Sequence, residues 1–102
     1  MPFLALEKLI NLHDGYRRRV KRDALDLLLL QESGEIYIIQ SRCPHREHSL
    51  EQADVEDGLI ICPLHQFGFR LDTGAHVGGL CDGLQMWPAV FDGSHVGIDL
   101  PS

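Results

Sequence analysis

The sequence lacks a long hydrophobic run. Its longest aliphatic block, residues 27–30, lies between Asp26 and Gln31, whereas a membrane-spanning helix needs roughly 18 or more apolar residues in succession. Near the amino terminus, Glu7 and Lys8 occupy positions where a secretory signal would need an unbroken apolar stretch. We therefore expect no membrane anchor and a cytoplasmic location.

Basic residues are also scarce. The chain has 9 Lys and Arg against 15 Asp and Glu, which gives a formal net charge of -6. Because nucleic-acid binding needs positive potential over a broad surface, a nucleic-acid partner is not expected. Five of the basic residues lie within residues 17–22. We interpret this run as an edge strand whose charges prevent further strand pairing, with partner docking as the rarer alternative.

Cysteine is limited to three residues, an odd number. Two of them, Cys43 and Cys62, lie in short segments that also contain histidine. In a reducing compartment this pattern indicates metal binding rather than disulfide bonds. The third, Cys81, is expected to be a small core or loop residue, because four metal ligands are available without it.

Helical periodicity is nearly absent from the chain. With 102 residues it has the size of one small domain, and only residues 5–12 show helical spacing of apolar residues. Short apolar runs separated by turn residues predict a mainly β fold. We expect strands at residues 25–30 and 36–39 as a central hairpin, at 59–61 and 67–71, and as a second hairpin formed by 84–91 and 96–100.

Two short motifs contain the candidate metal ligands of the sequence. Cys43-Pro44-His45 is followed after sixteen residues by Cys62-Pro63-Leu64-His65. Each segment offers one thiolate and one imidazole, and together they suit either tetrahedral zinc or an iron–sulfur pair with two histidine ligands. Common zinc modules pair like ligands within a segment, whereas these segments are mixed, which favours a site that bridges two metals.

The motifs and their surroundings resemble the Rieske family. The resemblance rests on both motifs and extends over roughly thirty residues, with a weaker continuation at Cys81, Leu84 and Trp87-Pro88. It includes Arg46, Leu50, Gly58, Phe67, Phe69, Leu71 and Thr73-Gly74. It implies a fold of antiparallel β-sheets in a single domain, with a cluster-binding subdomain of two loops at residues 42–80 and a basal β part at 1–41 and 81–102.

The resemblance also implies a cofactor and its ligands. One [2Fe–2S] cluster per chain would have Cys43 and Cys62 on the inner iron and His45 and His65 on the outer, solvent-facing iron. High-potential relatives have a disulfide between the two loops and hydroxyl donors to the cluster sulfurs. The corresponding positions here are His48, Leu64, Phe67 and Phe69, which supply neither, so we expect a low redox potential.

The function implied by this resemblance is that of a soluble ferredoxin. It would accept single electrons from a flavin-dependent reductase and pass them to a terminal oxygenase, without being an enzyme itself. Two alternatives stay open. The chain could be the small subunit of an assimilatory nitrite reductase, with the large subunit as acceptor, or a structural zinc-binding module.

Overall fold

The computed structural model describes residues 2–44, 48–63, 67–79 and 83–100. Within these ranges the chain forms ten strands and one short 3-10 helix, with no α-helix, and all strand pairings are antiparallel. Among these residues there is also no helix long and apolar enough to cross a membrane. The mainly β fold that the sequence predicts is confirmed.

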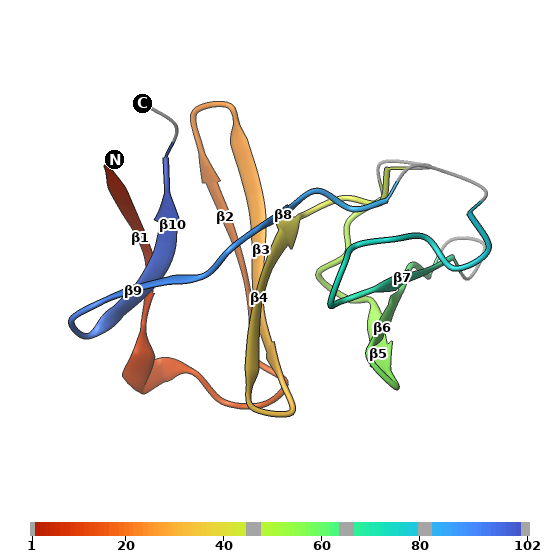
Figure 1. Ribbon diagram of the computed structural model, residues 1–102, viewed down its shortest axis with the longest axis horizontal. Coiled ribbons are helices and arrows are strands. Elements are labelled where there is room, and N and C mark those ends of the chain that lie inside the picture. Colours follow the sequence, from red (N-terminus) through yellow and green to blue (C-terminus); the bar gives the residue numbers. More distant parts are fainter. Residues whose placement is uncertain (1, 45–47, 64–66, 80–82, 101–102) are drawn as a thin grey trace.

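The strands form three sheets (Figure 1). The first has the order β1-β10-β9, with β1 at Phe3–Lys8, β9 at Val90–Asp92 and β10 at His95–Asp99. The second has the order β2-β3-β4-β8, with β2 at Arg17–Arg22, β3 at Leu25–Glu32, β4 at Glu35–Gln40 and β8 at Met86–Trp87. The third has the order β5-β6-β7, with β5 at Asp54–Glu56, β6 at Leu59–Ile61 and β7 at Gly68–Arg70.

The predicted central hairpin is confirmed by β3 and β4. Their ladder runs from Leu27↔Gln40 to Glu32↔Glu35. The two residues of the turn, Ser33 and Gly34, both have positive φ, 51° and 79°, as the tight hairpin turns that match strand twist require.

Alternate residues of this hairpin enter two separate hydrophobic clusters. Leu28, Leu30 and Ile39 face the cluster that contains both Cys43 and Cys62, while Leu27, Leu29 and Ile38 belong to a second cluster with Leu6, Val96 and Ile98. Because successive strand residues point to opposite faces, a run of four leucines can serve two cores at once. The middle sheet therefore separates the candidate site from the β1-β10-β9 sheet.

The helical spacing of apolar residues at 5–12 does not correspond to an α-helix in the structure. This segment forms β1, which pairs with β10, followed by the 3-10 helix η1 at Leu9–Asn11. The strand register shifts between Ala5 and Glu7, so that Leu6 and Glu7 are both buried. A β-bulge of this kind interrupts the two-residue alternation, and the apolar residues on either side of it then have helix-like spacing.

The expected strand at residues 84–91 is divided in the structure. Met86 and Trp87 pair with β4, whereas Val90 and Phe91 pair with β10 in another sheet. Pro88 lies between the two strands, and a proline cannot donate to a strand ladder. The hairpin that joins β9 to β10 is confirmed, with Gly93 in its turn at φ 60°.

Candidate metal centre

The first motif begins a loop that is closed by backbone hydrogen bonds. The Cys43 amide donates to the His48 carbonyl at 2.8 Å, and the Leu50 amide donates to the Ser41 carbonyl at 2.8 Å. Between these two contacts, Arg42 and Ser49 form an isolated antiparallel bridge. The chain thus leaves β4, forms a closed loop and returns alongside itself.

The second motif begins a loop with the same closure. The Cys62 amide donates to the Phe67 carbonyl at 2.7 Å. This loop connects β6 to β7, whose ladder ends at the pair Ile61↔Gly68. In both loops, therefore, the cysteine amide bonds to the carbonyl of the fifth residue after it.

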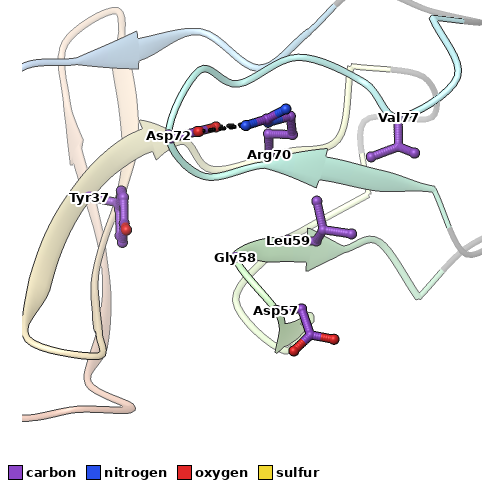
Figure 2. Close-up of a pocket in the computed structure, with 7 residues that line it drawn as sticks. All are labelled: Tyr37, Asp57, Gly58, Leu59, Arg70, Asp72 and Val77. Carbon is purple, nitrogen blue, oxygen red and sulfur yellow. Dashed lines mark hydrogen bonds and ion pairs between the residues drawn. The ribbon is translucent and has the colours of Figure 1, made fainter.

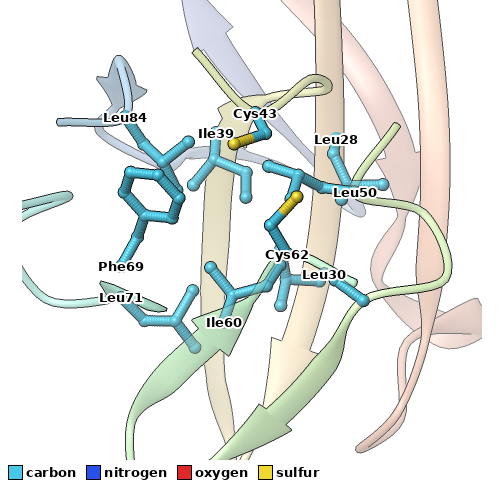
Figure 3. Packing of buried hydrophobic residues seen from close by; sticks show 11 residues of the cluster. Leu28, Leu30, Ile39, Cys43, Leu50, Ile60, Cys62, Phe69, Leu71 and Leu84 are labelled. Atoms are coloured by element: carbon cyan, nitrogen blue, oxygen red, sulfur yellow. The ribbon is translucent and has the colours of Figure 1, made fainter. Parts of the chain in front are cut away.

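Both cysteines are buried in one hydrophobic cluster. Cys43 is 1% exposed and Cys62 is fully buried, and both pack with residues such as Leu50, Ile60 and Phe69. Figure 3 shows the two side chains entering this cluster from separate loops. Residues that lie nineteen positions apart in sequence are thereby brought into one buried environment.

The other two predicted site residues, His45 and His65, lie outside the described residues, as does Cys81, which is expected to be a core or loop residue. In sequence, each histidine falls between the two residues that close its loop. Among the described residues no three His, Cys, Asp or Glu side chains form a group that could hold a metal. The described part of the chain therefore contributes the two thiols of the predicted ligand set.

The two cysteines fit the inner side of a metal centre. Thiolates are soft ligands that suit iron–sulfur clusters and zinc, and burial among aliphatic and aromatic side chains limits the access of water to them. A hydrophobic surrounding of this kind also influences redox potential. The buried pair of cysteines does not by itself distinguish an iron–sulfur cluster from zinc.

His76 packs on aromatic residues next to the second loop. Its ring lies 4.9 Å from that of Phe67 and 5.3 Å from that of Phe69, measured between centroids. The backbone supports this position through the Phe69↔His76 bridge and a 2.9 Å hydrogen bond from the Val77 amide to the Gly68 carbonyl. The position of His76 could not be predicted from the sequence, since nothing in its spacing indicates that the chain returns beside β7.

A surface pocket of about 450 Å³ lies elsewhere, between β4 and the β6–β7 hairpin (Figure 2). Tyr37, Leu59 and Val77 form its apolar side, and Arg70 donates two hydrogen bonds to Asp72 at 3.0 and 2.7 Å. These hydrogen bonds lower the pKa of the Asp72 carboxyl. Neither Cys43 nor Cys62 is among the described residues that line this pocket.

A comparison with protein-family models decides between the possible kinds of metal centre. The model of the Rieske [2Fe–2S] domain matches residues 4–87, most of the chain. The chain belongs to the Rieske [2Fe–2S] domain family. An iron–sulfur centre is therefore the metal centre of this Rieske protein, and the resemblance drawn from the two motifs is confirmed.

Curated relatives of this Rieske protein are ferredoxin subunits. A protein of Shigella boydii serotype 4 named 3-phenylpropionate/cinnamic acid dioxygenase ferredoxin subunit is 38% identical over 80 residues, which cover 74% of this chain and 73% of the relative. The protein of the same name from Escherichia coli K12 is 36% identical over the same shares of both chains. These relatives are electron-carrying components of dioxygenase systems.

Solved structures confirm the fold. A Sphingomonas yanoikuyae B1 ferredoxin matches with a TM-score of 0.85 at 24% identity, over 98% of this chain and 100% of that one. The ferredoxin of carbazole 1,9a-dioxygenase from Nocardioides aromaticivorans IC177 matches with a TM-score of 0.82 at 23% identity, over 96% and 97%. A putative nitrite reductase small subunit also matches, with a TM-score of 0.79 at 17% identity over 98% and 100%.

Proposed function

We propose that this protein is a one-electron carrier of the dioxygenase ferredoxin type, with one [2Fe–2S] cluster per chain held by Cys43, His45, Cys62 and His65. The observation that carries the proposal is the placement of Cys43 and Cys62, each at the start of a closed loop and both buried in one cluster. Curated ferredoxin subunits at 36–38% identity support the carrier role.

The chain's own residues have distinct tasks in this proposal. Cys43 and Cys62 would hold the buried side of the cluster, where apolar neighbours limit the access of water. His45 and His65 would supply the other two ligands, on the side that faces the partners. When bound, the cluster supplies a one-electron redox couple.

The proposed ligand positions also suggest a division of the chain into two parts. We propose that residues 42–80 form the cluster-binding subdomain, while residues 1–41 and 81–102 form the base that supports it. Sheet topology supports this division, because β5, β6 and β7 pair only with one another among the described strands, and β8 then returns to β4. We further propose that the protein acts in the cytoplasm.

The proposed partners follow from the relatives. A flavin-dependent reductase would be the electron donor and a terminal oxygenase the acceptor. One solved neighbour is described as a complex of reduced oxygenase and oxidised ferredoxin of carbazole 1,9a-dioxygenase, which supports an oxygenase as acceptor for a protein of this fold. Reduction by dithionite, followed by rapid mixing with an oxidised aromatic-ring dioxygenase oxygenase, tests whether the electron is transferred.

The nitrite reductase small subunit shares the fold, so the fold alone does not choose between the two roles. The curated relatives favour the dioxygenase ferredoxin. A large subunit that copurifies stably with this chain and takes its electrons would reverse the assignment.

The ligand assignment is tested by cysteine substitution with a matched control. Cys43→Ala and Cys62→Ala should each abolish the visible absorbance of the cluster, because each removes a proposed iron ligand. Cys81→Ala should retain it, since Cys81 has no ligand role in the proposal. Retained absorbance in either of the first two variants, or its loss only in the Cys81 variant, would contradict the assignment.

A further inference from the structure

The first loop is held less firmly by its own strands than the second. The second loop continues directly from β6 into β7, which form a regular ladder with three residue pairs. Among its described residues, the first loop has a single isolated bridge, Arg42↔Ser49, near its base. Its two arms, residues 41–43 and 49–53, therefore need support from outside the loop if Cys43 is to stay in place.

That support comes from the basic strand β2. Arg17 and Arg19 lie two positions apart and so point to the same face of the strand, with side chains 19% and 30% exposed. Arg18 lies on the opposite face, is 54% exposed and pairs with Glu7 at 2.9 Å. The face that bears Arg17 and Arg19 reaches the first loop.

The Arg17 side chain binds backbone carbonyl groups in the returning arm of the loop. The Arg17 Nη1 group donates to the carbonyl of Ala53 and, at 3.3 Å, to the carbonyl of Glu51. Ala53 and the neighbouring Leu50 are buried in the cluster that contains both cysteines. Charge-assisted hydrogen bonds to buried backbone are stronger than neutral ones.

Arg19 and Asp26 connect to both arms. Arg19 forms a two-bond pair with the Asp26 carboxylate at 2.7 and 2.6 Å and lies 3.9 Å from the Glu51 carboxylate in the returning arm. In the outgoing arm, the Ser41 amide donates to the Asp26 carbonyl at 3.1 Å, and Arg42 lies 3.9 Å from the Asp26 carboxylate.

The neighbours of Asp26 stabilise the negative charge of its carboxylate. The hydrogen bonds from Arg19 lower the pKa of the Asp26 carboxyl far below its usual range, so it stays ionised at neutral pH. A planar guanidinium paired through two bonds also fixes orientation, which a lysine would not do.

We infer that Arg17, Arg19 and Asp26 form a loop brace that positions the first ligand loop, and with it Cys43, for cluster binding. The basic run of β2 is then a support for the site rather than a docking patch. The inference rests on the proposed ligand assignment.

Release of iron from the oxidised holoprotein tests the loop brace. The variants are Arg17→Gln and Arg19→Gln, with Arg18→Gln as the matched control, because it removes the same charge from the same strand but acts on Glu7 and Tyr16 and not on the first loop. The release rate is measured as the loss of the visible absorbance of the cluster in excess EDTA, a chelator that binds ferric iron. The first two variants should release iron about tenfold faster than wild type, as expected for the loss of charged hydrogen bonds; Arg18→Gln should stay within about twofold of wild type.

A paramagnetic resonance spectrum of the reduced protein separates positioning from general stability. Displacement of Cys43 should shift the g-values in Arg17→Gln and Arg19→Gln but not in Arg18→Gln, even where the thermal midpoint of Arg18→Gln falls. Asp26→Asn gives a second route to the same result if an arginine variant does not fold. Equal release rates and unchanged spectra in all four variants would overturn the brace; a wild-type protein that binds no iron would instead overturn the proposed function.

Discussion

Glu7 is a buried carboxylate on β1, remote in sequence from the two motifs, that depends on its polar neighbours. It accepts hydrogen bonds from the hydroxyl of Tyr16, from Asn11 at 3.0 Å, from the Lys8 amide at 2.7 Å and from Arg18 at 2.9 Å. These bonds, led by that of Tyr16, lower the pKa of Glu7 from 4.5 to about 2. The ionised form is thus stabilised in the folded protein.

This shift predicts a pH dependence of stability. Because the pKa is lower in the folded than in the unfolded state, the contribution of Glu7 is complete above about pH 4.5 and is lost as the pH falls toward 2. Glu7→Gln should lower the free energy of unfolding by about 2 kcal/mol at pH 7. The difference from wild type should shrink between pH 4.5 and 2 in urea titrations; a difference that stays constant over this range would contradict the account.

The side chains of Phe67 and Phe69 indicate a low redox potential. Phe69 is fully buried beside the cysteines and Phe67 packs against the same cluster, yet neither has a hydroxyl to donate to a cluster sulfur. Since such hydrogen bonds raise the potential, we expect a midpoint near the bottom of the Rieske range, roughly -150 mV. Protein-film voltammetry measures it directly, and a midpoint well above zero would show that other donors dominate.

At the scale of the element, the pairing of β1 with β10 requires a residue without a side chain. A Cβ atom added at Gly97 would lie 1.9 Å from the Leu4 carbonyl oxygen, a backbone atom that cannot rotate away. Gly97→Ala should therefore lower the free energy of unfolding by about 3 kcal/mol. The matched control is Gly68→Ala in β7, where the nearest atoms would be side-chain carbons at 3.8 and 3.9 Å.

Denaturant unfolding of the two alanine variants gives the comparison. We expect Gly68→Ala to stay within about 1 kcal/mol of wild type, because its Cβ would make ordinary contacts. If both variants lose the same stability, the close approach of β1 to β10 is not the reason for glycine at position 97.

Some strands could be predicted from the sequence, whereas others could not. The β3–β4 hairpin was predicted correctly, because alternating burial on two faces and the Ser33-Gly34 turn are local properties. The β1 strand was not, because its pairing partner β10 lies about ninety residues away and the bulge at Leu6 changes the spacing that a local pattern reports. Local periodicity predicts an element only where distant pairing does not alter it.

At the scale of the whole molecule, the sequence predicted which residues form the site better than how they are supported. Cys43 and Cys62 are distinguished by motif chemistry, and the structure buries both in one cluster. The role of β2 could not be predicted, since the contacts of Arg17 with Glu51 and Ala53 span more than thirty residues. The basic run that suggested a solvent-exposed edge is an edge strand in the structure, but two of its arginines face inward to the first loop.

Two buried cysteines and two histidines are the proposed ligands of the iron–sulfur cluster. Metal and acid-labile sulfide analysis of the purified protein, together with paramagnetic resonance after reduction, tests this proposal most directly. We predict a brown protein with two irons and two sulfides per chain, as a [2Fe–2S] domain requires, and a rhombic signal that appears only on reduction. A colourless protein with one zinc per chain and no sulfide would contradict the account.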